Sequence, residues 1–401
     1  MNIRVLIAAA ALLPLLSVGL VVVPGRATER WREMTQWALR SELDWKERDF
    51  TRTPLFGESV AGSAFEVYPR AIEQAKELGR DDTTLLRDLR LHSDRVTIAA
   101  AAAFEVRWQT PITTMQAGAH KSDARPAVQW KHGINANQTH LMPARDLVNA
   151  CLIVARRHCA SGNSTAGLEL LLDAATFASD LQQSPVIVDQ MVASSLLAIV
   201  VMEALGEDVL RQLSARELGV LEQALERLDE RCRPGFDGRG EALLLANTLQ
   251  KGAVGEPPAA ESLELTKTSW HYGWSKRWAA ADSVMLLVDV CEALVQGSEL
   301  AWPQREQLLA TQRARLSTDG GSLLVGWSET LLGGERTLRT VRTHLRLLRM
   351  AVTYRRTGTA LPLQDPFGDG LLLQEPRAGG ARFWSRGGSE AQPLERTTTR
   401  R

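Results

Sequence analysis

A long apolar stretch over residues 144–205 has to be buried, and this requirement limits the folds that the chain can adopt. It divides into three helix-like segments, separated by short polar breaks at 161–164 and 183–185. Apolar residues recur in the first two segments at the spacing of one helical face, and the third segment is apolar almost all round. Such segments hide their apolar surface only by stacking on one another, so the sequence predicts an all-α fold, an irregular array of stacked helical hairpins.

The N-terminus predicts a membrane segment. Residues 5–23 carry no charge, and as a helix they would span about 28 Å, close to the ~30 Å hydrocarbon thickness of a bilayer. We therefore expect residues 1–28 to be a signal anchor, with a cleaved signal peptide as the alternative. The short positively charged tail before this segment favours a single-pass protein of the bacterial inner membrane with its bulk facing the periplasm. Cleavage would instead give a periplasmic or secreted protein.

Charge and cysteine content exclude several classes of function. The 47 basic and 47 acidic residues cancel, which gives no argument for a nucleic-acid partner. The four cysteines, Cys151, Cys159, Cys232 and Cys291, lack CxxC spacing and lie in apolar, helix-like settings. We expect buried thiols there, with one disulfide as the alternative, and we predict neither a metal site nor a cofactor.

The sequence predicts one helical domain over residues 29–362. It contains a long loop over 109–143, rich in proline and glycine, and a mobile insertion over 251–262. Before the loop we expect helices over 65–78 and 85–106, the second opened by an N-terminal cap at Asp81-Asp82-Thr83-Thr84. The later predicted helices cover 214–232, 238–249, from 270 or 275 to 295, 303–316 and 336–356. A small β-hairpin over 363–386 and a disordered tail over 387–401 complete the prediction.

Two rows of side chains are candidate binding surfaces. The first lies on the helix predicted over 336–356 and consists of Arg339, Arg342, Arg346 and Arg349. These guanidinium groups follow one face, where they would bind an anionic partner or pair with acidic neighbours such as Glu222, Glu226 and Glu230. The second row consists of Trp270, Trp274 and Trp278, which would stack on a sugar or peptide or else belong to the core.

Catalytic signatures are missing from the sequence. It contains no GxSxG, HExxH, Walker loop or GxGxxG. We therefore predict no catalytic residue. The carboxylates Asp282 and Asp289, a heptad apart on an apolar helix, are the candidates if the protein is an enzyme.

The order of these parts resembles a set of uncharacterised, exported or membrane-anchored, mostly helical bacterial proteins. The likeness rests on the apolar N-terminus, the core over 144–205, and a tail that contains Tyr354-Arg355-Arg356-Thr357-Gly358, Asp365-Pro366-Phe367-Gly368 and Phe383-Trp384-Ser385. The tail alone is also similar to the C-terminus of type II secretion pseudopilins, although the sequence lacks their prepilin N-terminus and acidic end. The resemblance implies a place in the cell envelope and brings no catalytic residue.

We therefore expect a non-enzymatic scaffold or binding protein of the cell envelope, with a helical groove that holds an envelope protein or a cell-wall partner. The alternative is an envelope enzyme, a hydrolase or a carbohydrate-active helical fold, that works through carboxylates.

Overall fold

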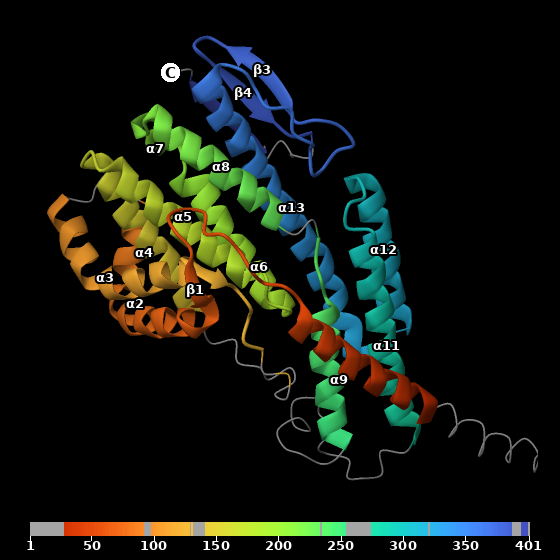
Figure 1. The fold of residues 1–401 in the computed structure, drawn as a ribbon. Coiled ribbons are helices and arrows are strands. Elements are labelled where there is room, and N and C mark those ends of the chain that lie inside the picture. The colour runs from red at the N-terminus through yellow and green to blue at the C-terminus, as the bar shows by residue number, and fades with distance from the viewer. Residues whose placement is uncertain are drawn as a thin grey trace, which may run out of the picture.

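The computed structural model describes residues 28–91, 98–128, 130, 141–232, 235–253, 274–319, 321–386 and 394–399. Most of these residues are helical, and a small antiparallel sheet lies at one end of the molecule (Figure 1). The predominance of helix and the small C-terminal sheet confirm the sequence prediction. The predicted signal segment, 1–28, lies outside the described residues except for its last residue. Within the described residues, no helix is both long and apolar enough to cross a membrane.

The helices and strands follow one another along the chain in a fixed order. They are a helix over residues 28–47, β1 (Val60–Ser63), η1 (Ala64–Glu66), α2 (Tyr68–Leu91), α3 (Ile98–Ala119), β2 (Lys121–Asp123), α4 (Leu141–Ala160), α5 (Ser164–Leu181), α6 (Ile187–Ala198), the π-helical turn η4 (Ile199–Ala204), α7 (Glu207–Gln212), α8 (Ala215–Arg231), α9 (Arg239–Ala253), α11 (Trp274–Gln296), α12 (Trp302–Asp319), α13 (Gly321–Thr357), β3 (Leu373–Arg377), β4 (Gly380–Trp384) and β5 (Glu395–Thr399).

The three helices predicted within 144–205 are α4, α5 and α6, and the polar breaks between them lie where the sequence places them. Helices α4 and α5 pack on each other and on α2 and α3. Their apolar faces, from Leu147 and Cys151 on α4 to Leu168 and Leu171 on α5, are buried in the largest apolar cluster of the protein. This burial explains why segments with so few charged side chains form stable helices.

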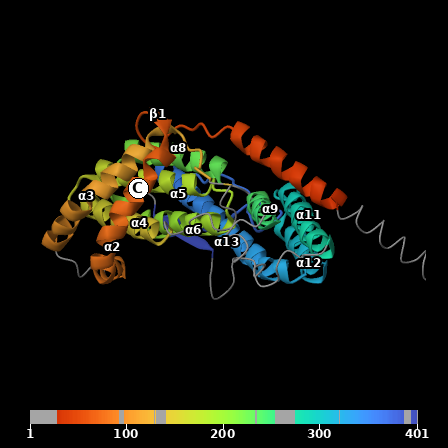
Figure 2. The same ribbon diagram turned by 90° about the horizontal axis from the view of Figure 1, so that it is seen from below.

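A second apolar cluster lies at the other end of the array, where α9, α11 and α12 pack together (Figure 2). The helix over 28–47 lies across this end and buries Met34 and Ala38. Three partly buried tryptophans of this helix also pack against the second apolar cluster: Trp31, Trp37 and Trp45.

Helix α13 connects the two ends. It extends over 37 residues and so begins earlier than the helix predicted over 336–356. Leu345 belongs to the first cluster, Leu338 to the second, and Leu347 to a third, smaller cluster beneath the C-terminal sheet.

The loop predicted over 109–143 is wrong in its first part and in its last three residues, which begin α4. Helix α3 continues through Pro111 to Ala119, and β2 follows and pairs with β1. A proline inside a helix costs about 3 kcal/mol, because it removes a backbone hydrogen bond and crowds the preceding turn. Burial of Trp108, Ile112 and Met115 on the same helix offsets that cost. Residues 129 and 131–140 lie outside the described part of the chain.

The helix start predicted at Asp81-Asp82-Thr83-Thr84 is also wrong, because α2 runs straight through these residues. Asp82 is buried and accepts a hydrogen bond from Trp108 Nε1 at 2.9 Å. Arg107 pairs with the same carboxylate at 2.9 Å. The carboxylate thus joins α2 to α3 and does not cap a helix.

The C-terminal hairpin is present as β3 and β4, joined by a turn with Gly379 at φ 74°. The disorder predicted over 387–401 is wrong for residues 395–399, which form β5 and extend the sheet along β4. Three successive threonines suit a strand, and Arg396 of β5 is anchored by donating to the carbonyls of Val201 and Leu205. Residues 387–393 lie outside the described part.

Other parts of the prediction have simpler outcomes. All four cysteines are free and buried, and burial raises the pKa of the Cys232 thiol to about 12. Of the insertion predicted over 251–262, residues 251–253 complete α9, and the remainder lies outside the described residues.

Candidate functional site: an arginine-lined cleft beside α5

A cleft of about 570 Å³ opens where four parts of the chain meet. Its walls are the extended segment 49–53, the end of β2, the C-terminal turn of α5 and the C-terminal turns of α8. We call it the arginine cleft, because Arg52, Arg227 and Arg231 line it together with Asp180. Segments more than a hundred residues apart in the sequence thus contribute to one polar cavity.

Arg52 and Asp180 form the floor of the arginine cleft. The Arg52 side chain is 6% exposed, and its Nη2 lies 2.7 Å from Asp180 Oδ2. The guanidinium also donates to the carbonyls of Gly118 and Ala119, which are left unpaired where α3 ends. Tyr68 donates its hydroxyl to the same Asp180 oxygen at 2.6 Å. One arginine therefore joins segment 49–53, α3 and α5.

Burial governs the protonation of this floor. It raises the pKa of Asp180, although Arg52 and the Tyr68 hydroxyl both favour the ionised carboxylate. Burial and the Asp180 charge raise the pKa of Tyr68 well above its ordinary value, so the phenol remains a hydrogen-bond donor.

The other two arginines come from α8 and lie one helical turn apart. Arg227 Nη1 donates to the carbonyl of Pro54 at 3.1 Å, and Arg231 Nη2 donates to the carbonyl of Thr53. The remaining terminal nitrogen of Arg231, Nη1, is buried and has no hydrogen-bond partner. A buried donor without an acceptor costs free energy, about 1–3 kcal/mol or more for a charged group.

Three guanidinium groups crowd around one buried carboxylate. Burial lowers the pKa of Arg231, and the charges of Arg52 and Arg227 lower it further against the attraction of Asp180. Among the residues that the structure describes, neither Arg227 nor Arg231 forms an ion pair with a carboxylate. Two further carboxylates, Asp49 and Glu230, also line the arginine cleft, but both are exposed, so the three guanidinium groups share a single buried carboxylate.

Local sequence explains how α8 presents these arginines. Ser214 caps the helix and forms a capping box with Glu217. Burial opposes ionisation of Glu217, but hydrogen bonds from Ser214, Thr165 and Ser164 lower its pKa to about 2. This carboxylate ties α8 to the start of α5, so the two helices reach the cleft in a fixed relation.

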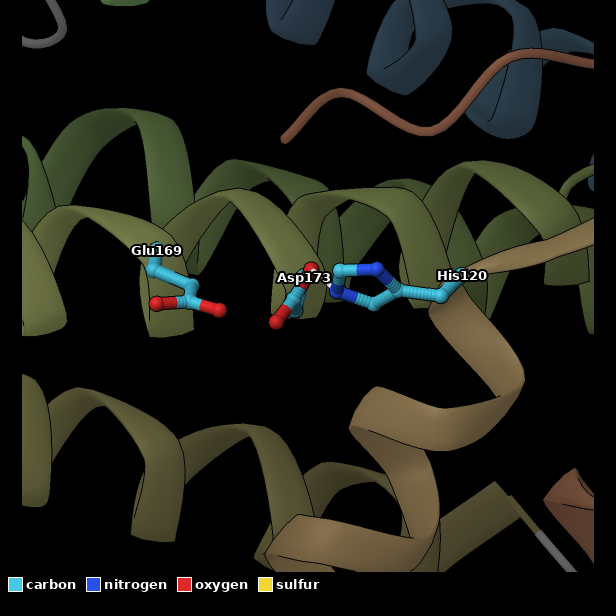
Figure 3. A group of neighbouring side chains, drawn as sticks. All are labelled: His120, Glu169 and Asp173. Atoms are coloured by element: carbon cyan, nitrogen blue, oxygen red, sulfur yellow. Dashed lines mark ion pairs between the residues drawn. The ribbon is translucent and has the colours of Figure 1, made fainter. Parts of the chain in front are cut away.

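A second polar cluster lies closer to the N-terminus of α5. Its side chains are of the kinds that bind metal cations. It consists of His120, which directly follows α3, and of Glu169 and Asp173 on α5 (Figure 3). One ligand atom from each residue lies within 4.8 Å of the other two. No sequence pattern predicted this cluster, because residues 109–119, which place His120 at the end of α3, were expected to form a loop.

The arginine row predicted as a binding surface lies against α8. Arg342 and Arg346 pair with Asp229 at 3.2 and 3.0 Å, and Arg349 pairs with Glu226. Arg339 is buried and donates to the carbonyls of Pro366, Ser298 and Leu300. The structure thus engages all four guanidinium groups within the protein.

The remaining candidates do not meet in one place. Trp270 lies outside the described residues, and for Trp274 and Trp278 only the backbone, within α11, is described. Asp282 pairs with Arg30 at 3.1 Å and is half-exposed, and Asp289 is exposed. Neither carboxylate lines the arginine cleft.

Comparisons with known proteins add no further constraint. No family model, no curated protein and no solved structure matches this chain.

Proposed function

We propose that the protein is a non-enzymatic binding protein that holds the anionic group of a small molecule, a carboxylate or a phosphate, in the arginine cleft. One observation carries the proposal. Arg231 has a buried nitrogen without a hydrogen-bond acceptor, and it lies beside two further guanidinium groups and a single buried carboxylate.

An anion in the cleft would reduce the repulsion among the arginines, and a rotation of the Arg231 side chain would bring the unused donor to it. Guanidinium groups bind planar carboxylate and phosphate oxygens through pairs of hydrogen bonds. The volume of about 570 Å³ lies within the range of small-molecule sites, roughly 300–1,000 Å³. Asp180 would remain with Arg52 and orient the polar end of the ligand.

Anion binding can be tested by calorimetry and by thermal unfolding with inorganic phosphate, pyrophosphate and succinate. Sodium chloride at matched ionic strength serves as the reference. We expect at least one of the three anions to raise the melting temperature above the chloride value. Arg231→Gln should weaken binding at least tenfold, because one charge and one pair of donors disappear.

Arg216→Gln is the matched control, because Arg216 is an exposed arginine at the opposite end of α8. It should leave binding unchanged. The melting temperature of each variant without ligand shows whether the fold is kept. Equal binding by the two variants, or no response to any of the three anions, would refute the proposal.

We also propose that residues 1–28 place this domain at the bacterial inner membrane, facing the periplasm. The uncharged run over 5–23 supports the proposal. Alkaline phosphatase fused after residue 401 should be active only with the full chain, and the same fusion to residues 29–401 is the control. The mass of the mature protein then distinguishes a retained anchor from a cleaved signal peptide. An inactive full-length fusion would exclude this location.

A further inference from the structure

We infer that His120, Glu169 and Asp173 bind a divalent cation of the zinc type, with one position left for water. This inference concerns a different site from the arginine cleft and does not depend on it. The ligand atoms would be His120 Nε2, Asp173 Oδ1 and a carboxylate oxygen of Glu169, and each of the three residues has a ligand atom within 4.8 Å of those of the other two.

Two elements bring the three side chains together. Glu169 and Asp173 lie one turn apart on α5, so their carboxylates share a face of that helix. His120 lies just beyond the end of α3, and its ring points at Asp173 (Figure 3). Imidazole nitrogen and carboxylate oxygen are the ligands that zinc takes in many catalytic sites.

The distance between the ligand atoms of His120 and Asp173 already suits a metal ion. His120 Nε2 lies 3.3 Å from Asp173 Oδ1. With metal–ligand bonds of about 2.0–2.1 Å, two ligands of a tetrahedral zinc ion lie about 3.3 Å apart. Glu169 is only partly buried, and its ligand atom lies within 4.8 Å of those of the other two residues.

The imidazole is held in the orientation that metal binding requires. Its Nδ1 lies 3.2 Å from the carbonyl oxygen of Glu58, which only accepts, so Nδ1 carries the proton. The backbone at Gly57 lies against the ring, since a Cβ there would be 2.6 Å from His120 Cε1. Histidine ligands in metal sites commonly donate their second nitrogen to a carbonyl in this way.

A neutral imidazole cannot satisfy both of its neighbours. If Nδ1 carries the proton, the Nε2 lone pair faces Asp173 Oδ1, and two acceptors oppose each other. A cation between them, either a second proton or a metal ion, removes the conflict.

Asp173 supplies a free, buried ligand atom. Its side chain is 0% exposed, and Gln116 Nε2 holds Oδ2 at 2.9 Å. Oδ1 has no hydrogen-bond partner, and His120 Nε2 is its only ion-pair contact among the described residues. A divalent ion would neutralise the carboxylates of Asp173 and Glu169.

The test uses the full chain after treatment with a chelator. Zinc chloride is titrated into the protein while heat and melting temperature are recorded, and magnesium and calcium chloride are titrated separately. We expect one zinc ion per chain, a rise in melting temperature, and a tetrahedral d–d spectrum when Co²⁺ replaces Zn²⁺. Magnesium and calcium should have little effect, because they prefer sites richer in oxygen ligands.

His120→Asn and Asp173→Asn should each weaken zinc binding at least tenfold. Glu169→Gln should weaken it as well, and because Glu169 is only partly buried this variant keeps the fold if the other two lose it. The matched control is His158→Gln. His158 Nε2 also lies 3.3 Å from a carboxylate oxygen, that of Glu105, but outside the three-residue cluster.

Three outcomes would overturn the inference. They are no binding of zinc, equal binding by the His120 and His158 variants, and a Co²⁺ charge-transfer band that identifies a cysteine thiolate as a ligand.

Discussion

Arg305 and Glu335 form an ion pair in which neither side chain is exposed. Their nitrogen and oxygen atoms meet at 2.9 and 3.1 Å in the paired geometry typical of guanidinium and carboxylate groups. Glu335 also accepts from the backbone nitrogen of Phe236, and Arg305 donates to the carbonyl of Leu294. The pair thus links α12 and α13 to each other, to the last turn of α11 and to the segment that precedes α9.

We predict that Glu335→Gln lowers the free energy of unfolding by about 3–5 kcal/mol, because it leaves the Arg305 charge buried without its counterion. Urea unfolding measures the loss. Glu375→Gln at the exposed Arg377–Glu375 pair is the control, and a loss below about 1 kcal/mol is expected there. Similar losses in both variants would contradict this account.

Glu241 should make the stability of the protein depend on pH. Burial, reinforced by the charge of Asp189, raises its pKa to about 7, although the backbone nitrogen of Ile187 donates to it. The folded protein therefore holds a proton that the unfolded chain releases near pH 4.5. The stabilisation is complete below that pH and is lost as the pH rises to about 7, by roughly 3 kcal/mol.

Glu241→Gln tests this prediction, because an amide mimics the protonated acid and still accepts from Ile187. Compared with the unmodified protein, the variant should melt higher at pH 8 and at nearly the same temperature at pH 4.5. An equal fall in melting temperature at both pH values would show that the protonation of Glu241 does not cause the pH dependence.

Gly57 and Gly162 separate two effects of a positive φ. Their φ angles are similar, 70° and 83°, but a Cβ would meet the His120 ring only at Gly57, and nothing lies within 4 Å at Gly162. Gly162→Ala should cost about 1 kcal/mol, from backbone strain alone. Gly57→Ala should cost more, because the imidazole has to move. Equal melting temperatures of the two variants would mean that the ring yields freely.

Arg396 is expected to hold β5 and η4 together. It is partly buried, and desolvation of its guanidinium group lowers its pKa to about 10; it donates to the carbonyls of Val201 and Leu205. Arg396→Met keeps the stem but leaves both carbonyls without this donor, and we predict a loss of about 2 kcal/mol in thermal or urea unfolding. Arg377→Met, on the exposed strand β3, should have little effect.

Local patterns predicted the centre of the fold well. The apolar stripes of α4 and α5, the polar breaks between them and the hairpin of β3 and β4 depend on neighbours in the sequence, and periodicity and turn residues reveal such features. The same reasoning failed at Pro111. There the packing of Trp108 and Met115, which no local pattern reports, outweighs the proline.

The candidate sites could not be predicted, because they depend on contacts between distant segments. Arg52 and Asp180 are 128 residues apart in the chain, and neither lies in a motif. The spacing of Arg227 and Arg231 by one turn of α8 was the only local sign of the arginine cleft, and it is common on helix surfaces. The strand β5 was hidden in the same way, since Arg396 finds its carbonyl partners only in the folded chain.

Helix α13 runs through the whole array and packs at both of its ends. Over 37 residues it measures about 55 Å, and its side chains enter all three apolar clusters. Leu345 and Leu347 lie in one turn but on nearly opposite faces, and they belong to different clusters, so a change in that turn affects both clusters. Within the described residues, separation of the two ends would therefore require α13 to leave at least one of the clusters that it helps to form.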